Sequence, residues 1–330
     1  MAPALPEGYA EFYPLIAEKM FRVEETFTSW LGSDVDVLSR AGQHLALTGG
    51  KRLRPALMLL CSGAVGYTGE HDVLFGAVFE FIHTATLVHD DVIDAADVRR
   101  GRPSLNRLWG NELSVLVGDH LYLKAMKMAL VADNLRIIDL LADTTLKMIE
   151  GELIQTHTNG RLDVTEEEYL GIVDCKTARL FSTCCQVPAM LAGRPANEER
   201  ALAAYGLGLG MAFQLVDDLL DLTADERVLG KPVGDDIRQG KLTLPLIRLL
   251  ARGRPHDRQR VEQVVSDGSF RTVSRSEITS ALEETGILDE SRRAARSWAD
   301  RALDAVSALP QSQYRAALER VPGFVLSRNR

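Results

Sequence analysis

Two acidic runs of the same form stand out in the sequence. They occupy residues 90–94 and 217–221, each reads Asp-Asp-x-x-Asp, and each follows an apolar stretch. On a helix, residues four apart share one face, so the first and last aspartates of each run project together. Like charges at this spacing repel, and carboxylates in apolar surroundings are costly unless something neutralises them. The pattern therefore predicts that multivalent cations bind at both runs.

Magnesium is the cation that this arrangement favours. Mg²⁺ prefers oxygen ligands in octahedral geometry and is usually held by one or two carboxylates together with substrate phosphates. Two helices that each offer Asp-x-x-x-Asp would hold several such ions around a diphosphate. A solvated acidic helix face explains one run, but it is a poor explanation of two matching runs at the ends of apolar stretches.

Basic residues gather in three loops. Residues 49–55, Gly-Gly-Lys-Arg-Leu-Arg-Pro, place three cations after a flexible turn, and residues 99–102, Arg-Arg-Gly-Arg, place three more beyond the first acidic run. In a third loop, Lys231 and Lys241 flank a pair of aspartates at 235–236. Solvated loop charge would explain any one of these groups. Beside two acidic runs, they suit an anionic ligand bridged to the protein through Mg²⁺.

Helical periodicity dominates the chain, strand-like alternation is almost absent, and the sequence predicts an all-α fold. The segment 70–95 is apolar nearly all round, which is typical of a helix at the centre of a large fold. No linker is long or polar enough to separate domains, so we expect residues 1–330 to form one domain. Predicted helices span 9–31, 35–47, 54–65, 70–95, 105–132, 134–158, 176–192 and 197–222.

Composition excludes several classes of protein. The formal net charge of −8 disfavours nucleic acid as a partner. The four cysteines fit no zinc spacing, so we expect buried thiols and a reducing, cytoplasmic compartment. Neither a signal peptide nor a bilayer-spanning apolar run is evident.

The ordered set of motifs resembles that of the trans-isoprenyl diphosphate synthases, the polyprenyl synthetase family, over nearly the whole chain. The closest likeness is to bacterial long-chain octaprenyl and heptaprenyl diphosphate synthases. The resemblance implies a single large helical bundle around a central cavity. Besides the two acidic runs, it rests on residues 49–55, 83–89, 99–101, 118–119, 150–152, 176–178, 213–214, 230–231 and 240–241.

The resemblance also implies roles for individual residues. The main ligands of about three Mg²⁺ ions would be Asp90, Asp94 and Asp217, with Asp91, Asp218 and Asp221 ligating or supporting them. The allylic diphosphate would bind Arg99, Lys176, Lys231 and Lys241. The diphosphate of isopentenyl diphosphate would bind Lys51, Arg54, His83 and Arg100. Thr177 and Gln214 would lie near the developing allylic cation.

Product length is predicted from the turns before the first acidic run. In short-chain members of the family a bulky aromatic residue closes the pocket there, whereas this chain has the small residues Ala85 and Thr86, with Ile82 and Phe81 further down. This favours an open tunnel and a long, octaprenyl-like product for quinone side chains, grown from farnesyl or geranylgeranyl diphosphate. Compact helix packing would also explain the small residues.

Other interpretations stay open at this stage. One alternative is a short-chain farnesyl or geranylgeranyl diphosphate synthase, and another is a non-catalytic subunit that supports a partner synthase. A di-iron protein is disfavoured because Glu80-x-x-His83 has no second copy. The Gly-x-Gly-x-Gly pattern at 206–210 lacks a βαβ context, so we expect close helix packing there. The resemblance further implies a homodimer, with peripheral membrane contact for product release.

Overall fold

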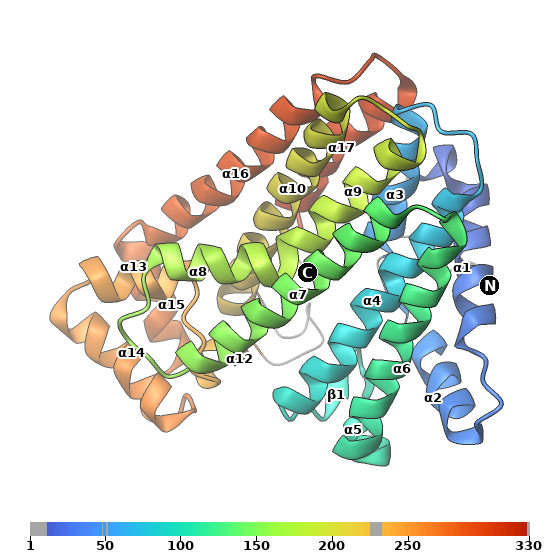
Figure 1. The fold of residues 1–330 in the computed structure, drawn as a ribbon. Coiled ribbons are helices and arrows are strands. Elements are labelled where there is room, and N and C mark those ends of the chain that lie inside the picture. Colours follow the sequence, from blue (N-terminus) through green and yellow to red (C-terminus); the bar gives the residue numbers. More distant parts are fainter. Residues whose placement is uncertain (1–11, 48, 51, 225–232, 329–330) are drawn as a thin grey trace. The chain divides into compact units, whose positions relative to one another are not determined.

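The computed structural model describes residues 12–47, 49–50, 52–224 and 233–328 (Figure 1). The fold is all-α, as predicted. The chain forms two compact units, each assembled from separate stretches of sequence. Unit 1 takes its described residues from 1–141, 184–202 and 307–318, and unit 2 from 142–183, 203–306 and 319–330. The prediction of a single domain stays a prediction.

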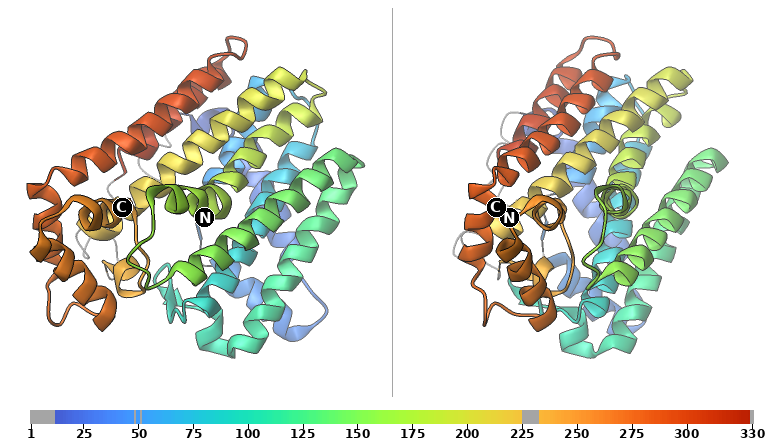
Figure 2. Two further views of the ribbon diagram at one scale, coloured as in Figure 1. Left: turned by 60° about the vertical axis from the view of Figure 1, so that its left-hand side comes forward. Right: turned by 90° about the vertical axis from the view of Figure 1, so that its left-hand side faces the viewer.

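Unit 1 is organised around helix α4. Phe75, Val78 and Phe79 of this helix are fully buried, which accords with the apolar character predicted for the segment. Helices α1, α3 and α6 pack against α4, and Figures 1 and 2 show α6 running alongside it. The elements before α7 are the 3₁₀ helix Tyr13–Leu15, α1 (Ala17–Leu31), α2 (Asp36–Leu47), α3 (Leu53–Ala64), α4 (His71–Ile93), β1 (Val98–Arg99), β2 (Arg102–Pro103), α5 (Leu105–Trp109), α6 (Asn111–Ala129) and the 3₁₀ helix Leu130–Ala132.

Unit 2 contains a second apolar core, to which α8, α10 and α13 to α16 contribute. Its shorter helices begin at defined caps: Thr165 and Ser274 each form a capping box with a glutamate three residues on. The remaining elements of the chain are α7 (Leu135–Thr158), α8 (Glu166–Val173), a π-helix (Asp174–Ala178), α9 (Arg179–Leu191), α10 (Ala196–Thr223), α12 (Asp235–Arg238), α13 (Leu244–Arg252), α14 (Pro255–Asp267), α15 (Arg275–Glu284), α16 (Ile287–Val306) and α17 (Gln313–Leu326).

Three element predictions need correction. The single helix predicted over 105–132 is broken at Gly110, whose φ of 85° no helix residue adopts, and it becomes α5 and α6. The basic loop after the first acidic run is a short hairpin in which Val98 pairs with Pro103. The helix predicted to begin at Lys176 continues from α8 through the π-helix, so its start lies further back.

The glycines of 206–210 serve close packing, as predicted. A Cβ atom on Gly210 would lie 2.7 Å from Cα of Ala178, and one on Gly208 would lie 2.8 Å from the carbonyl oxygen of Trp298. A Cβ on Gly206 would overlap the carbonyl oxygen of Phe181. All three contacts lie within unit 2, so α10 needs these glycines to approach its neighbours. Across the described residues, no helix combines the length and hydrophobicity needed to cross a membrane.

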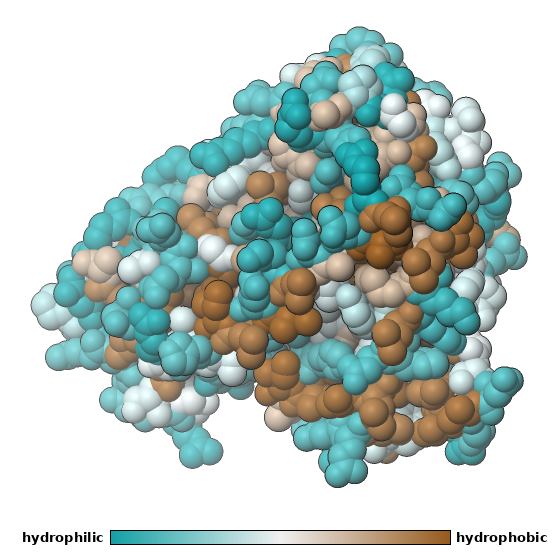
Figure 3. All heavy atoms as spheres, in the orientation of Figure 1, coloured by the Kyte–Doolittle hydropathy of each residue, from teal (hydrophilic) through white to brown (hydrophobic). Residues whose placement is uncertain are grey.

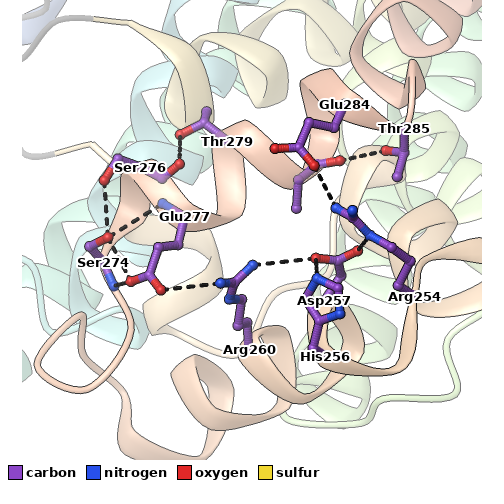
Figure 4. Close-up of polar contacts among 11 residues, drawn as sticks. Arg254, His256, Asp257, Arg260, Ser274, Ser276, Glu277, Thr279, Glu284 and Thr285 are labelled. Carbon is purple, nitrogen blue, oxygen red and sulfur yellow. Dashed lines mark hydrogen bonds and ion pairs between the residues drawn. The ribbon is translucent and has the colours of Figure 1, made fainter.

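A charged cluster joins α14 to α15 in unit 2 (Figure 4). Asp257 is fully buried and lies 2.8 Å from Nε of Arg254 and 3.4 Å from Nη1 of Arg260. Arg254 also pairs with Glu284, and Arg260 with Glu277, so both arginines bridge the two helices. Burial by itself raises the pKa of Asp257, but the hydrogen bond and charge of Arg254 and the charge of His256 outweigh it and lower the pKa below its ordinary value.

We expect Asp257→Asn to lower the free energy of unfolding by about 1–3 kcal/mol, because it removes the negative charge shared by two arginines and turns an NH₂ donor toward one of them at a buried position. A carboxyl group with a lowered pKa in the folded state stabilises the fold above its ordinary pKa. This contribution should therefore be complete above about pH 4 and fall as the pH drops below it. Urea unfolding at pH 7 and at pH 3 measures both effects.

The matched control is Asp289→Asn, which removes an exposed partner of Arg292 on α16. Such exposed pairs contribute about 0–1 kcal/mol, so this variant should unfold almost like the parent. Equal losses in the two variants, or a loss at Asp257 that does not shrink at low pH, would contradict the assignment.

Candidate active site

The first acidic run forms the C-terminal end of α4 in unit 1. Asp91 is buried, and its Oδ1 accepts a hydrogen bond of 2.7 Å from Nε of Arg99 on β1. Burial raises the pKa of Asp91, and the hydrogen bond and charge of Arg99 partly oppose that rise. Asp90 and Asp94 are half-buried. The hairpin thus supplies an arginine to the middle carboxylate of the run.

His83 lies in a strongly positive environment two turns before the run. Burial lowers the pKa of His83 well below its ordinary value, and the charges of Arg54, Arg100, Arg52 and Arg99 lower it further. His83 is therefore neutral at physiological pH and offers one N–H donor. The structure thus brings together four of the predicted substrate-binding residues, His83, Arg54, Arg99 and Arg100. Lys51 lies outside the described residues.

The two glycines before the first basic segment contact the hairpin. Nη1 of Arg100 donates to the carbonyl oxygen of Gly49, and a Cβ on Gly50 would lie 2.7 Å from that same nitrogen. Gly49, Arg100 and Asp91 also line one shallow pocket. Gly49 and Gly50, which precede α3, and the hairpin therefore border one site within unit 1.

The guanidinium of Arg52 is paired with two carboxylates in this structure. It lies 2.5 Å from Glu24 and 2.5 Å from Glu80, and it packs over the ring of Phe27. Burial alone would lower the pKa of Arg52, but Glu80 and Glu24 raise it above the ordinary value. The sequence pattern suggested three cations for an anion here, and one of them instead joins α1, α3 and α4.

The Gly118-Asp119 motif accommodates the side chain of His89. Nε2 of His89 lies 3.1 Å from the carbonyl oxygen of Val115 and 3.4 Å from Oδ1 of Asp119. A Cβ on residue 118 would overlap the imidazole ring. Gly118 therefore leaves the space in which His89 fixes the last turns of α4 against α6.

In unit 2, the second acidic run borders a cavity of about 130 Å³. Lys176, Thr177, Gln214, Asp218 and Lys241, all predicted site residues, line it. The structure thus brings together five predicted residues from separate stretches of the chain. Lys231 lies outside the described residues.

The π-helix positions two of these residues. Lys176 and Thr177 lie in the segment 174–178, a helix form that is rare and often marks functional sites. Nζ of Lys176 lies 2.5 Å from Glu152 and 2.7 Å from Oε1 of Gln155, both on α7. A Cβ on Gly151 would lie 2.7 Å from Cβ of Cys175, so α7 also packs closely against this segment.

A chain of hydrogen bonds connects the cavity to the second run. Oγ1 of Thr177 donates to Oε1 of Gln214 at 2.9 Å, and Nε2 of Gln214 donates to Oδ1 of Asp218 at 2.7 Å. The hydroxyl of Tyr169, on α8, donates to Oδ2 of the same carboxylate. Burial raises the pKa of Asp218 to about 6, although both hydrogen bonds lower it, and Asp217 and Asp221 raise it further.

The other two aspartates of this run also contact cations or amides. Oδ1 of Asp217 lies 2.8 Å from Nη2 of Arg328, whose buried guanidinium stacks on the ring of Phe213. The two carboxylate oxygens of Asp221 accept hydrogen bonds of 3.3 and 3.2 Å from the backbone N–H groups of Asp235 and Asp236 at the start of α12. A guanidinium therefore already neutralises one predicted metal ligand.

The donor chemistry of both runs fits magnesium. Their side chains offer only oxygen ligands, and each run lies in the last turns of a long helix, where the negative end of the helix dipole attracts cations. Neither helix has a basic residue in its last turn. In the part of the chain that the structure describes, no three His, Cys, Asp or Glu side chains are close enough to hold a metal together.

The predicted chain-length residues lie on α4 in the core of unit 1. Ala85, Ile82 and Phe81 are buried, and Thr86 is half-buried. The ring of Phe81 lies 4.7 Å from that of Phe27 on α1, which assigns it to the interface of these two helices. Their role in setting product length stays a prediction.

Sequence reasoning missed several residues that complete the site. Tyr169 and Arg328 contact the second run from α8 and from beyond the end of α17, and Gln155 contacts Lys176 from α7. Glu152 stood within a noted motif but had no role assigned. Tyr169 lies seven residues before Lys176, a spacing that would place the two on one face of a regular α-helix. The π-helix between them changes the turn per residue, so α-helical spacing could not predict which way Tyr169 points.

Comparison with known proteins gives consistent matches. A family model described as Polyprenyl synthetase matches residues 35–284. Octaprenyl diphosphate synthase of Escherichia coli (strain K12) is 39% identical over 316 residues, covering 96% of this chain and 98% of that protein. A short chain isoprenyl diphosphate synthase of Methanothermobacter thermautotrophicus is 37% identical over 297 residues, covering 89% of this chain and 91% of that protein.

The fold also matches solved structures. A polyprenyl synthase from Caulobacter crescentus CB15, in complex with calcium and isoprenyl diphosphate, superimposes with a TM-score of 0.92 at 34% identity. The match covers 97% of this chain and 98% of that one.

Proposed function

Since the chain belongs to the polyprenyl synthetase family and is a trans-polyprenyl diphosphate synthase, a prenyltransferase, we propose that it elongates an allylic diphosphate with isopentenyl diphosphate in a Mg²⁺-dependent, head-to-tail condensation. The observation that carries the proposal is the cavity of unit 2, where Lys176 lies beside the hydrogen-bonded series Thr177, Gln214 and Asp218. The positive charge of Lys176 suits an anionic leaving group, and the oriented dipoles of Thr177 and Gln214 suit the carbocation that remains.

The cavity residues of unit 2 act on the allylic substrate in this proposal. Lys176 and Lys241 bind its diphosphate, and Arg99 and Lys231 are assigned the same role from the sequence alone. When bound at the acidic runs, Mg²⁺, about three ions per site, supplies Lewis-acid stabilisation of the departing diphosphate. The oxygens of Thr177 and Gln214 stabilise the positive charge left on the allyl group. No side chain needs to act as a nucleophile.

The basic site of unit 1 binds isopentenyl diphosphate in this proposal. Arg54 and Arg100 supply positive charge, with Lys51 assigned from the sequence, and neutral His83 donates one hydrogen bond to a phosphate oxygen. The double bond of this substrate attacks the allylic carbon, and the proton that is then lost passes to the released diphosphate. The arginines would stay charged throughout the reaction.

We propose a long product, octaprenyl-like and suited to quinone side chains, made from a farnesyl or geranylgeranyl primer. Small, buried Ala85 supports a tunnel below the first run. A short-chain product is the alternative, favoured by the relative from Methanothermobacter thermautotrophicus. We also place the enzyme in the cytoplasm, on the support of its four free cysteines, with peripheral membrane contact when the product leaves.

We expect Asp90→Ala and Asp217→Ala each to lower kcat on the order of 10²–10³-fold, as when a group that stabilises transition-state charge is removed. The assay is incorporation of labelled isopentenyl diphosphate with farnesyl diphosphate and Mg²⁺, followed by chain-length analysis of the product.

The control is Asp300→Ala, which removes an exposed carboxylate on α16 and should leave turnover unchanged. Helical content by circular dichroism should match the parent in all three variants. Near-normal turnover in either acidic-run variant would refute the metal assignment, and an inactive parent protein would refute the proposed function.

We expect the series Ala85→Val, Ala85→Leu and Ala85→Tyr to shorten the product progressively, because a larger side chain would close the tunnel beneath the metal site. Chromatography of the dephosphorylated products against prenol standards measures the length. An unchanged length in all three variants would show that the tunnel lies elsewhere.

Exposed leucines on α6 support the proposal of a homodimer. Leu116 and Leu123 of α6, and Leu130 of the 3₁₀ helix that follows it directly, recur every seven residues and are 58–65% exposed. Figure 3 shows hydrophobic side chains on the face where Figure 1 draws α6. On α7, Leu146, Ile149 and Leu153 form a similar exposed row. Such rows resemble the apolar helix faces that pair across interfaces, and a second copy of the chain would cover them.

We expect Leu123→Glu to dissociate the dimer, because it places a charge in the middle of an apolar row. Light scattering coupled to gel filtration should report a mass of two chains for the parent and one for the variant. Leu47→Glu on α2, equally exposed, is the control and should stay dimeric. A monomeric parent, or a Leu123 variant that stays dimeric, would contradict this interface.

A further inference from the structure

Tyr169 is linked to the proposed catalytic residues by a hydrogen bond to Asp218. It is buried on α8, and its hydroxyl donates to Oδ2 of the carboxylate whose Oδ1 accepts from Gln214. A carboxylate offers about four lone-pair positions, and protein donors occupy one on each oxygen here. Asp218 is therefore arranged to receive hydrogen bonds from two sides.

The Asp218 carboxylate determines which way the Gln214 amide points. An ionised carboxylate only accepts hydrogen bonds, so the amide must turn its NH₂ group toward Asp218 and its oxygen away. Thr177 then donates its hydroxyl proton to that oxygen. The lone pairs of Oγ1 on Thr177 are left facing away from Gln214, in the lining of the cavity that also contains Lys176.

The hydroxyl of Tyr169 maintains the orientation of Asp218, and with it that of Gln214, only while it donates a hydrogen bond. The hydroxyl donates to Oδ2 of Asp218, and a phenol keeps its proton at neutral pH. Without it, one oxygen of a buried carboxylate would lose its partner, which is unfavourable for a charged group. The carboxylate would then turn, and the amide of Gln214 would lose its single orientation.

We propose that Tyr169 is a positioning residue for carbocation stabilisation: through Asp218 it orients the Gln214 amide, and through the amide the Thr177 hydroxyl, toward the allylic group. This inference rests on the proposed function. It adds a residue from α8 that lines the same cavity and whose effect, through Asp218, falls on the chemical step rather than on substrate binding.

The test is Tyr169→Phe, assayed with farnesyl diphosphate and isopentenyl diphosphate. We expect kcat to fall about 10-fold or more, as when preorganised dipoles at a developing charge are disturbed, while KM for isopentenyl diphosphate changes less than about twofold. The control is Tyr205→Phe, which removes the hydroxyl of another fully buried tyrosine of unit 2 and should leave both kcat and KM unchanged.

A double-mutant cycle separates positioning from a purely structural role. If Tyr169 acts through Gln214, Tyr169→Phe should cost less than about twofold in kcat when Gln214→Met is already present, because the two losses are not additive. Additive losses, or a parallel change in kcat and KM, would overturn the proposal.

A rescue variant distinguishes loss of the hydrogen-bond donor from a general effect of the substitution on folding. Tyr169→p-aminophenylalanine keeps the ring and places an N–H donor at the position of the hydroxyl, so it should retain kcat within about threefold of the parent. A rescue variant as slow as Tyr169→Phe would overturn the proposal. If Gln214→Met is slow while Tyr169→Phe is not, the inference fails and the proposed function stands. A parent without turnover would instead defeat the proposed function.

Discussion

Much of this structure depends on one electrostatic constraint: both acidic runs lie at the C-terminal end of a helix. Each acidic run lies in the last turns of a long helix, where the dipole is negative and acidic side chains are least favoured. Neither helix places a basic residue there to compensate. The charge must be balanced by other elements or by bound cations, and the loops around both runs are built to supply this balance.

The two units meet this constraint in different ways. In unit 1, Arg99 of the hairpin binds Asp91 directly. In unit 2, the middle aspartate receives neutral donors instead, from Tyr169 and Gln214, while Arg328 binds its neighbour Asp217. Burial raises the pKa of both middle aspartates: Arg99 partly opposes the rise at Asp91, and the hydrogen bonds from Tyr169 and Gln214 partly oppose it at Asp218, where the pKa reaches about 6. Matching sequences therefore acquire different electrostatic environments.

The sequence predicted what depends on residue type and spacing. The all-α fold, the buried α4 helix and the packing role of Gly210 followed from periodicity and from the absence of a strand pattern. What it missed depends on backbone torsion or on distant contacts. The break at Gly110 comes from a positive φ, and the pairing of Asp217 with Arg328 joins residues more than one hundred positions apart. Periodicity contains no information on either.

The π-helix has a consequence for how this region tolerates change. Residues 166–191 run as one continuous helix with an α-π-α form, and a π turn holds one more residue than an α turn. A π turn of about five residues and an α turn of about four each make roughly one revolution, so removing one residue from 174–178 would restore regular winding and leave the phase beyond it nearly unchanged. Ala178, which fits beneath Gly210, and Phe181, whose carbonyl lies against Gly206, would then keep their places. The side chains inside the segment, Lys176 and Thr177 among them, would be the ones to shift, so a one-residue deletion would disturb the cavity lining rather than the packing of α8 and α9.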